Sequence, residues 1–182
     1  MTTETLDIVY DIPKITDKPS RHTLAVLVDN EFGVLARVIG LFSGRGYNIE
    51  SLTVAEVEHE KKLSRITIVT SGTEHVIEQI KKLLERMVPV HKVHDLTVEG
   101  AHVERELALL KVVSKAENRQ AALKTADMFR AKVIDSTPES FVFEITGEAR
   151  TIDELIAMMQ PLGLTEICRT GIAAVSRGKQ GI

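Results

Sequence analysis

The sequence has one cysteine, no tryptophan and few other aromatic residues. Cys168 has no second thiol with which to form an intrachain disulfide or a cysteine-rich zinc site. A reducing compartment is therefore the simpler expectation. Aromatic residues make up only 4% of the chain, which leaves little material for stacking nucleic-acid bases. The formal net charge of −3 encodes no general attraction to nucleic acid or to an anionic membrane.

Long apolar runs and targeting signals are also missing. The first residues, Met1 to Ile8, contain no basic stretch and no apolar core, which argues against a secretory signal. No run approaches the ~18–20 apolar residues that a membrane helix needs. We therefore expect a cytoplasmic protein that has neither nucleic acid nor a membrane as its partner.

Catalytic signatures are missing as well. The sequence contains no phosphate-binding glycine loop, no nucleophile elbow and no metalloprotease helix signature. The histidines His91, His94 and His102 lie near one another in the sequence, but a spacing of three on a strand divides the first two between opposite faces. A metal site would also need further ligands. We expect surface or interface histidines, no metal site and no catalytic residue.

The remaining composition is that of a globular protein. With 43% hydrophobic and 27% charged residues, the 182-residue chain has enough material for one or two small domains. Residues 1–21 mix acidic residues, prolines and lysines without a sustained period, and they predict a flexible arm. A weaker alternative is that Leu6 and Ile8–Tyr10 form an extra edge strand or dock onto a partner.

The segment 22–99 predicts the order β-α-β-β-α-β. In the first helix, apolar residues recur at i, i+3, i+4 and i+7 and predict a face that packs on a sheet: Leu35, Val38, Ile39 and Phe42. The run Ser71-Gly72-Thr73 is placed to break the chain and to cap the second helix, which ends before Pro89. The expected strands are 23–28, 49–57, 63–70 and 90–98, and the first helix is about 33–45.

The segment 100–182 repeats this order in topology rather than in residue identity. Asn118 and Thr151 are placed to cap its two helices, and Pro161 to Gly163 should end the second one. The expected strands are 107–113, 132–137, 141–145 and 164–175. We therefore predict an α+β protein of two ferredoxin-like βαββαβ units of about 75 residues each, joined near residues 99–102.

The best candidate for a binding site is the pair of turns that flank the first helix. Asn30 stands where a helix cap is expected, Gly33 allows close approach to the backbone, and Asn48 occupies the turn after the helix. Each asparagine alone is explained by its turn. If the two turns adjoin, their asparagines surround the N-terminus of a helix, which favours an anion. Because an amide can also accept a hydrogen bond from an ammonium, a zwitterionic amino acid suits this place.

The run from Asn30 to Val54, NEFGVLARVIGLFSGRGYNIESLTV, resembles the small regulatory subunits of acetolactate synthase, also called acetohydroxyacid synthase. This long block is specific for that family, whereas its Gly-Val-Leu element alone would indicate only some ACT domain. The similarity extends over nearly everything after residue 21, through Leu63–Ile68, Ala101–Glu106, Thr170-Gly171 and Ser176–Gly178.

The resemblance implies an ACT domain at 22–99 that binds a branched-chain amino acid, usually valine, between the two protomers of a homodimer. It implies a C-terminal domain of related fold at 100–182. Phe32 stands where the resemblance leads us to expect a smaller residue, at the rim of the site. The effector-binding residues that it implies are Asn30, Gly33, Val34 and Leu35 of one protomer, with Asn48 and Ile49 supplied by the other.

The resemblance also implies a function. The chain would be a non-catalytic subunit that activates the large catalytic subunit and confers feedback inhibition by valine or a related end product of branched-chain amino acid biosynthesis. Thiamine diphosphate, magnesium and FAD are expected in the large subunit, and no cofactor in this chain.

Three alternatives stay open at this point. A free-standing ACT-domain amino-acid sensor would regulate another enzyme and would not co-purify with a thiamine-diphosphate enzyme. An RNA-binding ferredoxin-like module is disfavoured by the acidic charge and the missing aromatic ribonucleoprotein motifs. A stand-alone enzyme would have to turn over pyruvate without the large subunit.

Overall fold

The computed structural model describes residues 18–114, 116–179 and 181–182. Most of the predicted arm, with Leu6 and Ile8–Tyr10, lies outside the described residues. Among the described helices, none combines the length and the apolar character needed to cross a membrane.

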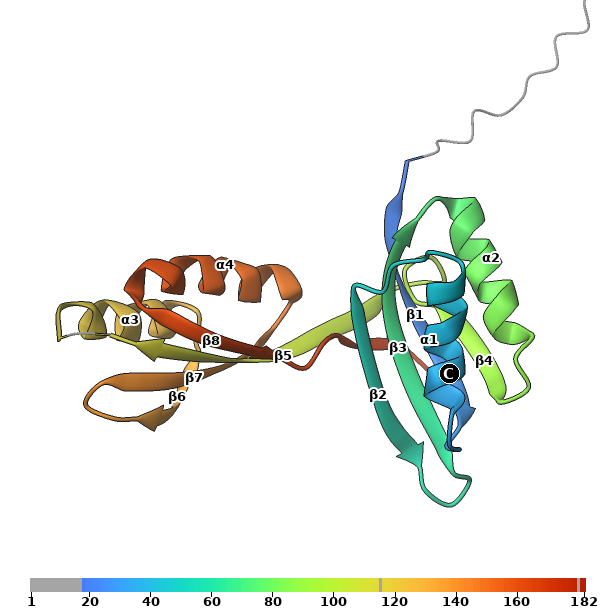
Figure 1. Ribbon diagram of the computed structural model, residues 1–182, viewed down its shortest axis with the longest axis horizontal. Coiled ribbons are helices and arrows are strands. Elements are labelled where there is room, and N and C mark those ends of the chain that lie inside the picture. The colour runs from blue at the N-terminus through green and yellow to red at the C-terminus, as the bar shows by residue number, and fades with distance from the viewer. Residues whose placement is uncertain (1–17, 115, 180) are drawn as a thin grey trace, which may run out of the picture.

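The first unit is an antiparallel sheet with the strand order β2-β3-β1-β4. Its helices α1 and α2 cover one face of that sheet (Figure 1). The core between them is built from alternate strand residues and one stripe of each helix, including Leu24, Val26, Phe42, Ile68 and Ile80. The elements are β1 (Ser20–Asp29), α1 (Val34–Gly44), β2 (Ser51–Glu58), β3 (Leu63–Gly72), α2 (Glu74–Glu85) and β4 (Val90–Asp95).

The second unit has the same arrangement, with the strand order β6-β7-β5-β8 and a core of its own. The prediction of two ferredoxin-like units is therefore confirmed. The elements are β5 (His102–Val113), α3 (Ala116–Met128), β6 (Lys132–Ser136), β7 (Ser140–Gly147), α4 (Ala149–Met159), a short 3-10 helix η1 (Gln160–Leu162) and β8 (Leu164–Arg169), followed by β9 (Ala173–Ser176).

Among the helices α2, α3 and α4, the predicted cap was right for one and wrong for two. Thr73 caps α2, where its hydroxyl accepts from the backbone N–H of Val76 at 3.4 Å. Asn118 lies inside α3, which begins at Ala116, and Thr151 lies inside α4, which begins at Ala149. A polar residue within the first turn gives nearly the same local signal as a cap, so the pattern places both helix starts three residues too late.

The last predicted strand, 164–175, is in fact two strands. β8 pairs with residues 108–112 of β5, and β9 pairs with residues 102–105 of the same strand. The twelve residues of β5 therefore extend from the first unit into the second, as Figure 1 shows. The predicted start at Leu107 was five residues late because residues 102–106, HVERE, carry mainly charged and polar side chains and no sustained apolar signal.

We call residues 170–176, which connect β8 to the end of β9, the return segment. It lies on the face of the first sheet opposite α1 and α2. A small buried cluster holds it there, composed of Ala25, Val69, Leu96, Ile172 and Ala174. The first sheet is thus covered by helices on one face and by the C-terminal part of the chain on the other.

Arg169, at the end of β8, links strands of the second unit to its last helix. Its Nε and Nη2 donate to the two carboxylate oxygens of Glu106 at 2.9 and 2.6 Å. Its Nη1 donates to Asp153 of α4 at 2.6 Å. The hydrogen bond to Glu106 is the main reason why the pKa of Arg169 is raised, so the cation persists wherever the protein is folded.

We predict that Arg169→Met lowers the free energy of unfolding by about 2 kcal/mol, because it leaves the buried Glu106 carboxylate without its cation. Arg150→Met is the matched control, since Arg150 pairs with Glu154 one turn away on the exposed face of α4. That variant should change stability by less than about 0.5 kcal/mol. Urea unfolding of both variants measures the difference, and equal losses would contradict the prediction.

Candidate functional site

The turn between β1 and α1 is fixed by its backbone. The N–H of Asp29 donates to the carbonyl of Pro89 at 2.9 Å, and the N–H of Asn30 donates to the carbonyl of Lys62 at 2.7 Å. Gly33 is the residue that caps α1, with a left-handed φ of 83°. The prediction that Asn30 is the cap was therefore wrong: the chain makes a further turn after Asn30 before the helix begins. The Asn30 side chain is exposed to solvent instead.

The N-terminus of α1 has free hydrogen-bond donors. Among the described residues, no side chain caps this helix, and its first turn contains no acidic residue. By contrast, α2 has both the Thr73 cap and Glu74 in its first turn. The N–H groups of Leu35 and Ala36 have no acceptor within the helix, because an α-helix leaves its first amides unpaired. The positive end of α1 is therefore available to an anion.

The buried face of α1 differs from the predicted one. Val34, Val38 and Phe42 are buried against the sheet, so the prediction was right for the last two. Leu35 and Ile39 are 37% and 36% exposed, and they were wrongly expected to pack on the sheet. The buried stripe starts one residue earlier than predicted because Val34 packs on the sheet in the first turn of the helix. Leu35 and Ile39 are left as apolar surface on the same helix that carries the free amides.

The second turn holds Asn48 and Ile49 between α1 and β2. The Asn48 carbonyl accepts from the Thr70 hydroxyl at 2.6 Å, while its side chain is exposed. Ile49 is partly buried and packs against the first core. Asn30 and Asn48 lie at opposite ends of α1, whose eleven residues correspond to roughly 16 Å of helix. The two turns therefore do not adjoin within one chain, contrary to our prediction from the sequence.

Each of the predicted surface histidines pairs with a different carboxylate. His91 lies 2.6 Å from Asp29, and His94 lies 2.5 Å from Glu99. His102 lies 3.4 Å from Glu104. Among the described residues, no group of three or more histidine, cysteine, aspartate or glutamate side chains is arranged to hold a metal ion.

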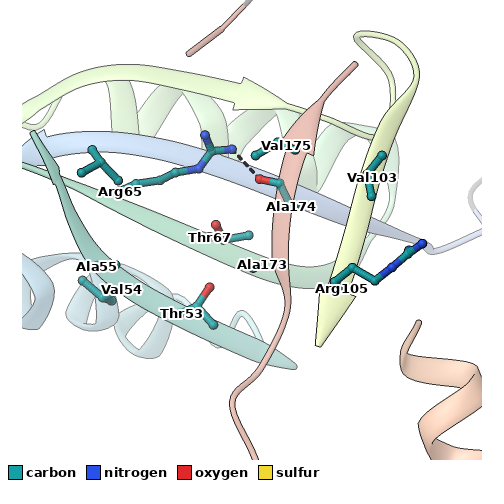
Figure 2. Close-up of a pocket in the computed structure, with 11 residues that line it drawn as sticks. Thr53, Val54, Ala55, Arg65, Thr67, Val103, Arg105, Ala173, Ala174 and Val175 are labelled. Atoms are coloured by element: carbon teal, nitrogen blue, oxygen red, sulfur yellow. Dashed lines mark hydrogen bonds between the residues drawn. The ribbon is translucent and has the colours of Figure 1, made fainter. Parts of the chain in front are cut away.

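A cavity of about 360 Å³ lies on the other face of the first sheet, where β2 and β3 meet β9. Figure 2 shows Arg65 reaching across it, and Nη2 of this residue donates to the carbonyl of Ala174 at 2.6 Å. Burial lowers the pKa of Arg65. The cavity is lined by residues other than the six predicted from the resemblance. No local pattern could have revealed it, because its walls come from strands more than a hundred residues apart in the sequence.

Comparison with known proteins identifies the family. A model of the acetohydroxyacid synthase small subunit-like ACT domain matches residues 24–92, and a model of the small subunit of acetolactate synthase matches residues 105–178. An acetolactate synthase small subunit from Aquifex aeolicus is 45% identical over 158 residues, which cover 86% of this chain and 81% of that protein. The chain belongs to the acetolactate synthase small-subunit family.

Further members of the family agree with this assignment. The acetolactate synthase isozyme 3 small subunit from Escherichia coli is 43% identical over 159 residues, covering 87% of this chain and 96% of that protein. The crystal structure of the acetolactate synthase small subunit from Thermotoga maritima gives a TM-score of 0.80 at 38% identity, covering 88% of this chain and 99% of that chain. The resemblance is confirmed, and this chain is not the catalytic subunit. The six effector-site residues stay a prediction.

We predict that Gly33→Ala lowers the free energy of unfolding by about 1 kcal/mol, because an alanine at positive φ is strained even where the space is open. Gly33→Asn should lose less, since asparagine adopts this conformation more readily. Thermal unfolding of the two variants measures this order. An alanine variant as stable as the unsubstituted protein would show that the turn relaxes freely.

Proposed function

We propose that this chain regulates the large, catalytic subunit of acetolactate synthase in the cytoplasm. It raises the activity of that subunit and makes it sensitive to valine or a related branched-chain amino acid. Thiamine diphosphate, magnesium and FAD belong to the catalytic subunit, and this chain binds only the effector. The observation that carries the proposal is that, among the described residues, no side chain caps the N-terminus of α1 in a member of this family. A free-standing amino-acid sensor is the alternative, and co-purification with the catalytic subunit separates the two.

In the proposed site, the effector carboxylate lies against the backbone from Gly33 through Val34 to Leu35. The Leu35 amide is unpaired within the helix, while the Val34 N–H also donates to the Glu31 carbonyl at 3.4 Å. These donors are held in place because Val34 is buried in the core. The helix dipole adds to the attraction for the carboxylate. The effector ammonium then needs an acceptor, which an exposed asparagine amide can provide. Asn30 supplies one amide of the same chain, and a second comes from Asn48 of the partner subunit.

The distance between the two asparagines supports a homodimer through residues 22–99, the proposed ACT domain. Because Asn30 and Asn48 flank α1, one ligand can contact both only if they come from different chains. Among the described strands, β2 pairs on one side only, with β3, and so offers a free edge. Leu35 and Ile39 add exposed apolar surface on α1. An isologous dimer would create two equivalent effector sites, and residues 100–182 would transmit or dock.

We predict that Asn30→Ala and Asn48→Ala each abolish inhibition by valine while activation of the catalytic subunit persists. Each change removes one polar contact to the effector without touching the core, because both side chains are exposed. Enzyme assays of the reconstituted complex measure inhibition. Calorimetric titration of the small subunit with valine, leucine and isoleucine measures binding. Asn118→Ala, at an exposed position in α3, is the control and should respond as the unsubstituted protein does. Unchanged valine sensitivity in both site variants would contradict the assignment.

We also predict that Ile39→Glu weakens self-association of the small subunit by about tenfold or more, corresponding to at least ~1.4 kcal/mol. A carboxylate buried in an apolar contact without a partner is costly. Met158→Glu introduces the same charge at a residue of α4 that is 42% exposed, and it should leave association unchanged. Sedimentation velocity over a range of concentrations measures both. A dimer as stable in the first variant as in the second would place the interface elsewhere.

A further inference from the structure

The two units are joined by a ribbon of two hydrogen-bonded strands. β5 runs outward from the first unit, and the chain returns along it through β8 and the return segment, as Figure 1 shows. The ladder continues beyond the strands themselves: the N–H of Thr170 donates to the carbonyl of Leu107 at 3.0 Å, and that of Arg177 to Ala101 at 2.8 Å. Such a ribbon transmits displacement better than a single flexible linker does.

The ribbon ladder is interrupted at Ile172, and β2 fills the gap. The N–H of Ile172 donates to the Ser51 hydroxyl at 2.9 Å, and its carbonyl accepts from the Thr53 hydroxyl at 2.7 Å. Ile172 is only 5% exposed, so water cannot readily replace these partners. Gly171 makes the close approach possible: its φ is +82°, and a Cβ there would lie 2.8 Å from the Ser51 hydroxyl.

A second attachment holds the ribbon to the centre of the first sheet. Glu104 of β5 accepts a hydrogen bond from the hydroxyl of Thr23 and another from Arg21 at 3.3 Å, both on β1. β1 lies between β3 and β4, whereas β2 is at the edge. The ribbon is therefore attached to the edge strand β2 and to two inner strands, β1 and β3, the latter through the hydrogen bond from Arg65 to the Ala174 carbonyl at 2.6 Å. A shift of β2 relative to β1 would tilt it.

The edge strand β2, which holds Ile172, begins three residues after Asn48 of the proposed effector site. Asn48 precedes Ser51 by three residues, or roughly 10 Å of extended chain. Along β2, Ser51 and Thr53 point to the return segment, while Leu52 between them packs against the core. The proposed effector contact thus lies in the turn just before β2, and the ribbon contacts lie within the first three residues of that strand.

We propose that Ser51 and Thr53 couple the effector site to the second unit. This inference rests on the proposed function, because it takes amino-acid binding at Asn48 as its input. Binding of the effector repositions the start of β2, and the two hydroxyls carry this shift to the buried backbone of Ile172. The return segment must follow, since leaving its N–H and carbonyl unpaired in a buried place is costly. The ribbon then moves the second sheet, and the catalytic subunit responds to that movement.

The test separates binding of valine from inhibition by it. Thr53→Val nearly retains the shape of the side chain but removes its hydroxyl, whereas Thr53→Ser retains the hydroxyl. Ser51→Ala removes the other hydroxyl. We call Thr53→Val and Ser51→Ala the loss variants. Thr165→Val is the matched control, because its hydroxyl donates to the Lys111 carbonyl at 3.1 Å within the second unit. Each small subunit is titrated calorimetrically with valine and assayed for valine inhibition after reconstitution with the catalytic subunit. Thermal unfolding identifies a variant that does not fold.

We expect Thr53→Val and Ser51→Ala to bind valine within about threefold of the unsubstituted small subunit. Inhibition of the reconstituted enzyme should need about tenfold more valine or fail to reach completion, within the 5- to 150-fold range typical of coupling between sites. Thr53→Ser and Thr165→Val should be inhibited normally. If Ser51→Ala does not fold, the comparison of Thr53→Val with Thr53→Ser decides the question.

The contrary outcomes are distinguishable. If the unsubstituted small subunit binds no branched-chain amino acid, the proposed function fails and this inference fails with it. If it binds valine and both loss variants are inhibited normally, the inference alone is overturned. Loss of valine binding itself in both variants would assign these hydroxyls to the site rather than to coupling. Impaired inhibition in Thr165→Val would overturn the inference too, because the effect would not be specific to β2.

Discussion

The arrangement of this protein depends on how the backbone of the return segment is paired. A strand that crosses from one sheet to another must satisfy its N–H and carbonyl groups at every residue, and buried groups have no recourse to water. At most positions β5 provides the partners. At Ile172 the side chains of β2 provide them. The units are therefore joined by backbone hydrogen bonds as well as by the covalent chain, and side chains of β1, β2 and β3 hold this connection on the first sheet.

The pairing of the return segment also makes the two units differ, although they share one fold. In the first unit the sheet face opposite the helices is occupied by the return segment and the cluster around Ile172. In the second unit the corresponding face carries a cavity of about 450 Å³ lined by apolar, polar and charged side chains, including Leu109, Lys111, Val142 and Glu166. Two units of one topology can thus divide the work of sensing and of transmission. The difference comes from where the C-terminal residues lie, and not from the βαββαβ pattern.

Much of the fold could be predicted because it depends on local chemistry. Alternating and helical apolar periods located most strands and the four main helices, and the Thr73 cap was correct because its hydroxyl bonds within the same turn. Asn30 was misread because a glycine at positive φ, three residues on, makes the cap by backbone conformation alone. The exposure of Leu35 and Ile39 depends on how Val34 packs against the sheet, which the period of the helix cannot resolve to one residue.

The long-range features could not be predicted from any local pattern. One strand was predicted over 164–175 because apolar residues occur on both sides of Gly171. The break at Gly171, where φ is +82°, is explained only by the close approach of β2. The contacts of Ser51 and Thr53 with Ile172 connect residues about 120 positions apart. The effector residues came from the resemblance, and their place at opposite ends of α1 became clear only from the structure.

The magnitudes indicate that a connection of this size suits regulation. A neutral hydrogen bond contributes about 0.5–1.5 kcal/mol net, so two of them amount to roughly 1–3 kcal/mol. The coupling free energy between two allosteric sites is typically about 1–3 kcal/mol as well. A pair of side-chain hydroxyls on one strand is therefore sufficient to carry such a signal. The free energy of these two hydrogen bonds is also small enough to leave each unit folded whichever state the other adopts, because each unit has its own buried core.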